Sequence, residues 1–214
     1  AIGASALNSN TTAAQCVAIG YQASYSQTNP DGNSAFGYQA MYSNATGANS
    51  VAVGRRAAYA ATDLDNSVAV GAYALTTNTT GDNNTAVGKD ALYSNTTASG
   101  STAVGYQAGY TNTTGPQNTF IGQQSGYNTN NATGYNTFVG RTSGYNNTTG
   151  YQNTFVGGDS GYYVTSGTKN TILGMYNGNQ GGVDIRTGSN YIVLSDGDGN
   201  PRAFWNNRSE EHTS

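Results

Sequence analysis

The chain reads Asn118-Thr119-Phe120-Ile121-Gly122, then Asn136-Thr137-Phe138-Val139-Gly140, then Asn153-Thr154-Phe155-Val156-Gly157. Looser copies of this motif also close on a glycine, and the closing glycines are Gly3, Gly20, Gly37, Gly54, Gly71, Gly88, Gly105, Gly122, Gly140, Gly157 and Gly174. Their spacing is 17 residues, except for one step of 18 between Gly122 and Gly140. A short fixed period indicates a solenoid, in which each repeat forms one coil that stacks on its neighbours.

When each repeat is numbered from its closing glycine as position 0, equivalent residues form columns. Position −1 is apolar in every copy, which predicts a buried core ladder. Its members are Ile2, Ile19, Phe36, Val53, Val70, Val87, Val104, Ile121, Val139, Val156 and Leu173.

Two further columns change in opposite directions along the chain. Position −2 is Ala from Ala1 to Ala103 and then becomes Phe or Ile, whereas position +4 is mostly Leu, Met or Ala before it becomes Gly from Gly109 onward. Close-packed interiors tolerate changes that conserve volume. We therefore expect the two columns to face each other across one thin layer, with Gly109 opposite Ala103 as an underfilled transition coil.

The remaining positions suggest how each coil is built. Alternation before the glycine predicts a strand of four to five residues, and glycine then turns the chain. Small residues at position +3, such as Ala108 and Ser125, predict the start of a second short strand. The sequence thus predicts an all-β parallel β-solenoid or β-roll of 17-residue coils. At about 4.8 Å per coil, ten coils make a rod roughly 50 Å long.

The composition limits the function classes. Charged residues make up 9% of the chain, and the formal net charge is −3, so no basic surface for nucleic acid is expected. No run approaches the about 20 apolar residues that span a bilayer, so no membrane insertion is expected. Cys16 is the single cysteine, which excludes a disulfide framework. The first residues already lie inside a repeat, which suggests that the chain is a fragment.

We divide the chain into three parts. Residues 1–174 form the repeat domain, and residues 175–207 form an irregular connector and a hairpin cap, with strands expected at 191–195 and 202–205 around a turn at 196–201. Residues 208–214, Arg-Ser-Glu-Glu-His-Thr-Ser, resemble the read-through translation of a sequencing adapter and are interpreted as a non-native tail. This tail holds both glutamates and His212, the only histidine.

Few residues could carry chemistry, so we expect no enzyme, no catalytic residue and no cofactor. Without a native histidine there is no histidine base or ligand, and the aspartates form no recurring pair. Asp196, Asp198 and Asn200 have the opening spacing of a calcium loop, but its twelfth position is Asn207 rather than Glu. The alternative for this segment is a plain hairpin turn.

A column of tyrosines is the candidate binding surface. At position +5 it includes Tyr93, Tyr110, Tyr127, Tyr145 and Tyr162. Aromatic faces suit sugar rings, so the column could bind glycan; the alternative is a structural ladder that packs against itself or a neighbouring chain. The threonines at position −3 allow a third hypothesis, a flat face that orders water or ice, although the first copies carry Val or Ser there.

The repeats resemble those of bacteriophage tail fibres. The resemblance lies in Asn84-Thr85-Ala86-Val87-Gly88, in Thr102 to Tyr110 and in Asn118 to Gly122. The stretch from Tyr191 to Arg202 is similar to the segment that leads toward an endosialidase-type intramolecular chaperone in those fibres. Ser67-Val68-Ala69-Val70-Gly71 also resembles the head repeats of trimeric autotransporter adhesins, where the repeat is usually shorter.

Both resemblances imply a homotrimeric β-roll shaft without catalysis. We therefore expect a structural or adhesive fibre, the shaft or head of a phage tail fibre in the virion, that contacts a host cell-surface glycan or protein. The alternative is a trimeric adhesin on a bacterial cell surface. A glycan-cleaving tailspike enzyme is the third class, and it lacks the positioned pair of acids that such chemistry needs.

Overall fold

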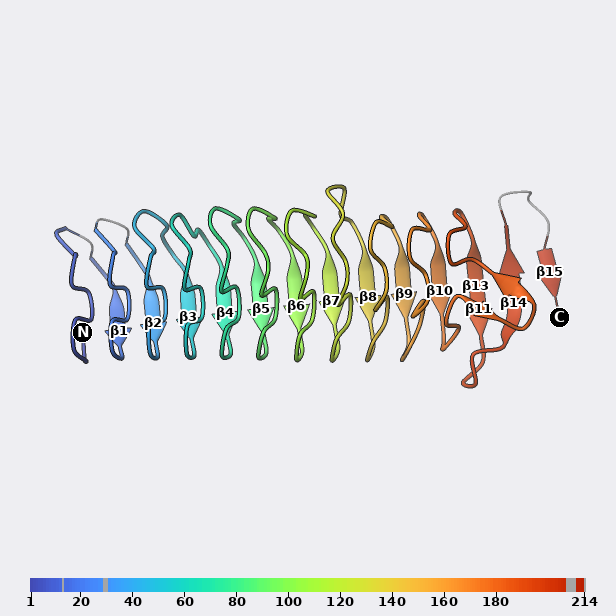
Figure 1. Cartoon of the computed structure of the whole chain (residues 1–214), viewed down its shortest axis with the longest axis horizontal. Helices are drawn as coiled ribbons and strands as arrows, with labels where there is room; N and C mark the ends of the chain where they lie inside the picture. Colours follow the sequence, from blue (N-terminus) through green and yellow to red (C-terminus); the bar gives the residue numbers. More distant parts are fainter. Residues whose placement is uncertain (13, 29–30, 207–210, 214) are drawn as a thin grey trace.

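The computed structural model describes residues 1–12, 14–28, 31–206 and 211–213. Its coils stack in sequence order along the long axis of the molecule (Figure 1). The first repeat forms only an isolated bridge, Ile2 with Ile19, and each later repeat contributes one strand: β1 (Val17–Ile19), β2 (Ser34–Phe36), β3 (Val51–Val53), β4 (Val68–Val70), β5 (Thr85–Val87), β6 (Thr102–Val104), β7 (Thr119–Ile121), β8 (Thr137–Val139), β9 (Thr154–Val156) and β10 (Thr171–Leu173). Neighbouring strands pair in parallel, which confirms the predicted all-β parallel β-solenoid.

The coils stack in strict register. Val87 pairs with Val104, and Val104 pairs with Ile121, so equivalent residues lie directly above one another. The one 18-residue step keeps this register, because Thr119 still pairs with Thr137. The extra residue is absorbed by the loop between β7 and β8, which projects beyond the other loops (Figure 1).

The closing glycine is required by steric contact as well as by conformation. Gly105 has φ +136°, and a Cβ added there would lie 2.5 Å from the carbonyl oxygen of Gly122 in the next coil. Real side-chain carbons do not approach a backbone oxygen that closely, so any other residue would push the coils apart at this corner. This contact explains why the glycine recurs at the period of the fold.

The predicted second strand is wrong. Positions +1 to +6 form turns, because residues at +2 and +4 adopt positive φ, as at Gln107 (φ 55°) and Gly109 (φ 61°). The backbone nevertheless bonds between coils: the N–H of Gly109 donates to Ser125 O (2.9 Å), and that of Gln107 donates to Lys89 O (3.0 Å). The turn thus satisfies its polar groups without becoming extended.

The predicted core column is also wrong by one position. In each three-residue strand the middle residue, position −2, is buried, and positions −3 and −1 face outward. Val104 and Val156 at position −1 are each 37% exposed, whereas Ala103 and Phe155 at position −2 are fully buried. Successive side chains in a strand point to opposite faces, so the thin interior takes the Ala and Phe column and leaves the Val column outside.

The opposed columns are confirmed. A Cβ added to Gly126 would overlap the Phe120 ring, and one added to Gly144 would overlap the Phe138 ring. The transition coil is not underfilled: a Cβ on Gly109 would lie 2.5 Å from Phe120 Cδ2. The ring of Phe120 therefore fills space beside its own coil and the preceding one.

Buried asparagines and serines at position −4 were missed in the sequence. Asn153 is fully buried; its Nδ2 donates to Gly167 O (2.8 Å), and its Oδ1 accepts the N–H of Asn170 (2.9 Å). In other coils serine replaces the accepting bond: Ser67 Oγ accepts the N–H of Asn84 (3.0 Å). These side chains satisfy backbone groups of the return loops, where no strand can do so.

The C-terminal part extends the sheet. Strand β13 (Ile192–Ser195) pairs in parallel with β10 after a 21-residue step, and β14 (Pro201–Trp205) returns antiparallel to it, as the predicted hairpin requires. The connector holds a small antiparallel pair, β11 (Asn179–Gln180) with β12 (Val183–Asp184). Tyr176 closes the core here: it is fully buried, and its hydroxyl donates to Val183 O (2.8 Å).

The tail at 208–214 is only partly described. Residues 211–213 form β15 (Glu211–Thr213), which pairs with β14, whereas residues 208–210 and 214 lie outside the described residues. The interpretation of this segment as a non-native tail stays a prediction.

The facing columns predict a compensated double substitution. Phe138→Ala leaves a cavity and should cost about 3–5 kcal/mol of stability, and Gly144→Leu alone should clash with the Phe138 ring. Together they recreate the Ala86 and Leu92 arrangement, so the combined loss in urea unfolding should be smaller than the sum by at least about 1 kcal/mol. Gly161→Leu, which faces Phe155, is the control; equal rescue by that change would contradict the pairing.

The position −4 column predicts a graded pair of variants. Asn153→Ala removes the partners of Gly167 O and the Asn170 N–H, so it should destabilise the chain by about 2–4 kcal/mol. Asn153→Ser should lose less, because the Ser67 hydroxyl already accepts the equivalent N–H. The measurement is urea unfolding followed by circular dichroism. Equal losses in the two variants would show that the hydrogen bond to Asn170 contributes nothing.

Candidate functional site

The five predicted tyrosines form one continuous stack. Ring centroids of successive members lie 5.1 Å apart from Tyr93 to Tyr162, and the interplanar angles are between 5° and 11°. The structure therefore brings together Tyr93, Tyr110, Tyr127, Tyr145 and Tyr162, which we call the tyrosine ladder. Burial raises the pKa of the Tyr110 phenol, and the neighbouring phenols of Tyr93 and Tyr127 add to this effect.

The stacking determines which part of each ring a ligand can reach. The rings of Tyr110, Tyr127 and Tyr145 are stacked on both sides by another tyrosine, so their faces are covered. A sugar that stacks on an aromatic side chain needs an uncovered ring face. Inside the ladder only ring edges and hydroxyls are left, and this favours the structural interpretation for the internal members.

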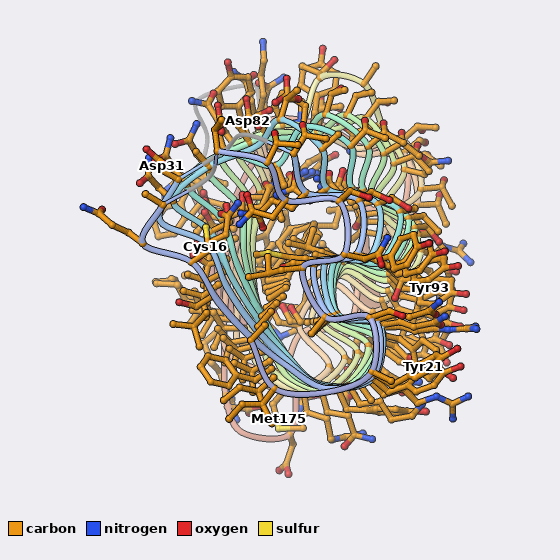
Figure 2. The ribbon with its side chains drawn as sticks, turned by 90° about the vertical axis from the view of Figure 1, so that its left-hand side faces the viewer. Cys16, Tyr21, Asp31, Asp82, Tyr93 and Met175 are labelled. Carbon is orange, nitrogen blue, oxygen red and sulfur yellow. The ribbon has the colours of Figure 1, made fainter. Side chains whose placement is uncertain are left out.

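Other aromatic and basic side chains share this side of the coil. Tyr25, Tyr42 and Tyr59 form a shorter stack with spacings of 5.0 and 5.2 Å. Arg56 lies over the Tyr59 ring at 5.0 Å, and Lys89 lies over the Tyr106 ring at 5.3 Å. Tyr21 and Tyr93 project on the same side of the coil, away from Asp31 and Asp82 (Figure 2).

Two ion pairs lie on this side of the coil. Lys89 Nζ lies 2.5 Å from Asp90 Oδ2, and Arg141 Nη2 lies 2.6 Å from Asp159 Oδ2. The hydrogen bond that Lys89 donates to the Asp90 carboxylate raises the pKa of Lys89.

Aspartates on the return loops support the backbone. Asp65 Oδ1 accepts the N–H of Ala48 (2.6 Å), and Asp82 Oδ1 accepts the N–H of Asp65 (3.1 Å). Each carboxylate thus binds a loop of the preceding coil. These bonds give Asp65 and Asp82 a structural role.

A second candidate surface is the outer face of the long sheet, formed by positions −3 and −1. We call it the outer sheet face. Its position −1 column is apolar from Ile2 to Leu173 and continues into Leu194, which is 37% exposed. The position −3 column is Val, Ser or Thr up to Thr171, and Ile192 continues it, so no charged residue interrupts the two columns in β1–β10 and β13.

The predicted threonine column is therefore half-buried on the outer sheet face, beside an apolar column. Thr102, Thr119 and Thr137 lie on adjacent strands in register. Their neighbours two residues on are Val104, Ile121 and Val139. The face is thus a mixed threonine and aliphatic surface, and the hypothesis that it orders water stays a prediction.

The calcium-loop candidate forms a hairpin turn. Asp196 Oδ1 accepts the N–H groups of Asp198 (3.0 Å) and Asn200 (2.9 Å), and Asp196 Oδ2 lies 2.5 Å from Arg202 Nη2. The bond from the Asn200 backbone, the largest effect, and the contact with Arg202 hold the pKa of Asp196 below its usual value. A cation would have to compete with Arg202 for this carboxylate. Asn207, the twelfth position of the proposed loop, lies outside the described residues.

The described residues contain neither a cluster of metal ligands nor a membrane-spanning helix. Among residues 1–12, 14–28, 31–206 and 211–213, no three His, Cys, Asp or Glu side chains are grouped as a metal site would need. No helix in the same part of the chain is long and apolar enough to cross a membrane.

Comparison with known proteins adds no relative. The chain matches no family model, no curated protein and no solved structure. The candidate surfaces must therefore be judged on their own geometry.

The turn around Asp196 predicts no response to calcium. The carboxylate is already bound by two backbone N–H groups and Arg202, so neither calcium nor a chelator should shift the melting temperature of the full chain. Differential scanning calorimetry in millimolar calcium and in chelator measures this. A calcium-dependent rise that Asp198→Asn abolishes would restore the calcium-loop hypothesis.

Proposed function

We propose that this chain is a structural and adhesive fibre protein, the shaft or head of a phage tail fibre that reaches a host cell surface. The observation that carries the proposal is the unbroken translational register from β1 to β10. Ten parallel strands at about 4.8 Å per strand give a rod roughly 50 Å long. Its stiffness comes from hydrogen bonds between successive coils, as a fibre needs.

We propose further that three chains associate through the outer sheet face. This face is about 50 Å long and roughly 10 Å wide, so its area is about 500 Å², of which the continuous position −1 column supplies the apolar part. Exposed apolar patches larger than a few hundred Å² usually mark an interaction site. Three copies around one axis would bury the exposed Val104, Ile121 and Val156, and the resemblance to trimeric β-roll repeats supports the number three.

The tyrosine ladder and the return loops would then face outward. In such an arrangement each coil offers a shallow polar contact, and three chains repeat every contact three times. Several weak contacts held on one rigid body bind more tightly than any one of them alone. The rod would position contacts with a host glycan or protein without catalysis. A trimeric adhesin of a bacterial surface would use the same geometry.

Lysines on the outer sheet face should prevent self-association. Val104→Lys combined with Val139→Lys places charges in the proposed interface without touching the buried column. Light scattering after size exclusion should show a trimer for the unchanged chain and a monomer for the double variant. Electron micrographs of the trimer should show straight rods.

A matched control is Thr97→Lys combined with Thr149→Lys, which adds the same charge to exposed loop positions. The control should stay trimeric. An unchanged chain that is monomeric at micromolar concentration would contradict the trimer, and release of sugar from host polysaccharide by that chain would contradict the non-enzymatic role.

A further inference from the structure

We infer that a recess at the C-terminal end of the tyrosine ladder binds a single uncharged pyranose ring. The recess is lined by Asp159, Tyr162, Tyr163 and Asn177, and its volume is about 240 Å³. Pockets for drug-sized ligands measure about 300–1,000 Å³, so this one suits one sugar ring. The inference deepens the proposed function, on which it rests, by naming a contact point for host glycan.

The recess exists because the repeat changes at this coil. In the regular coils the N–H of Asn146 bonds to the O of the next ladder member, Tyr162. One coil later, the N–H of Tyr163 bonds to Asn177 O (2.7 Å), so Asn177 takes the ladder position where another tyrosine would stand. The last ring of the ladder, Tyr162, therefore has a small amide beyond it where each internal ring has a second tyrosine.

A second departure from the repeat supplies another wall. Position +6 is Ser, Thr, Asn or Ala in the preceding coils from Ser26 to Asn146, but it is Tyr163 here. The Tyr163 ring is 50% exposed and meets the Tyr162 ring at 84°, with centroids 4.9 Å apart. Two nearly perpendicular rings form an aromatic corner that can contact the C–H face of a sugar.

The polar groups at the recess suit sugar hydroxyls. Asp159 Oδ2 is held by Arg141 at 2.6 Å, and its Oδ1 accepts the hydroxyl of Thr142, so the carboxylate is fixed in place. A carboxylate has about four acceptor sites, which leaves capacity for a ligand hydroxyl. Asn177 Oδ1 accepts the N–H of Asn179 (3.0 Å), and its Nδ2 has no partner among the described residues.

The charge at the recess selects against an acidic sugar. Asp159 lines the recess, whereas its partner Arg141 does not. The carboxylate of a uronic or sialic acid would approach Asp159 as a like charge, which is unfavourable. An uncharged hexose meets no such repulsion, and its hydroxyls can donate to Asp159 and accept from Asn177.

The recess is shallow, so a single site should bind weakly. Three copies on a trimer raise the effective affinity for a repeating glycan without any new contact. A fibre with such sites would bind a surface reversibly through one contact and tightly through many.

The test uses the full chain and four probes: the methyl pyranosides of glucose, galactose and mannose, and methyl glucuronide. Saturation-transfer NMR should show contact with the ring protons of at least one of the three uncharged probes. Tyr163→Ala should weaken that binding by about tenfold. This variant should fold, since Ala60 occupies the same column.

Tyr106→Ala is the matched control, because Tyr106 is exposed on the same side of the coil but outside the recess. This variant should bind the sugar probes as the unchanged chain does. The inference is overturned if no uncharged probe binds, if the glucuronide alone binds, or if Tyr163→Ala binds as well as the unchanged chain. Light scattering on the same samples separates this outcome from failure of the proposed fibre, because Tyr163→Ala should stay trimeric.

Discussion

The fold depends on how closely successive coils can approach at their glycine corner. At Gly105 the next coil's carbonyl oxygen occupies the place where a side chain would begin. Only a hydrogen atom fits there, and this contact lets the adjacent strands keep parallel hydrogen bonds in register. The same contact recurs from coil to coil. The strands, the core columns and the aromatic stack therefore all repeat with the same spacing along the axis.

The thin interior explains the other regularities. Each coil buries one residue from its strand and a few from its turn. A larger side chain in one column therefore requires a smaller one in the opposite column. Phe120, Phe138 and Phe155 fill the space that Leu75 and Leu92 fill earlier in the chain. The space nearest the return loops is polar, and buried Asn and Ser side chains there bind the backbone of those loops. So small a core leaves a long apolar surface outside, which is the physical basis for proposing self-association.

Repetition both stabilises the tyrosine ladder and limits what it can bind. Stacking of Tyr110, Tyr127 and Tyr145 covers their faces, so a regular ladder has little to offer a sugar ring. Recognition becomes available where the repeat ends, at Tyr162 and Tyr163, because Asn177 takes the next ladder position and leaves one aromatic corner open. In a protein built by stacking equivalent coils along one axis, the coil where the repeat ends is the natural place for a specific site.

The sequence alone determined the period, the parallel β-solenoid, the opposed columns and the C-terminal hairpin, because each leaves a regular mark in the order of residues. It also identified the five ladder tyrosines as one column. Only the tertiary structure decided which face each column takes. Apolarity suggested Val87 and Val104 for the core, but strand alternation around the buried Ala86 and Ala103 turns them outward. The second strand failed for a related reason: positive φ at Gln107 and Gly109 makes a turn that still bonds between coils. The recess could not be predicted from the sequence, because it depends on the backbone hydrogen bond between the N–H of Tyr163 and the O of Asn177 in the irregular connector.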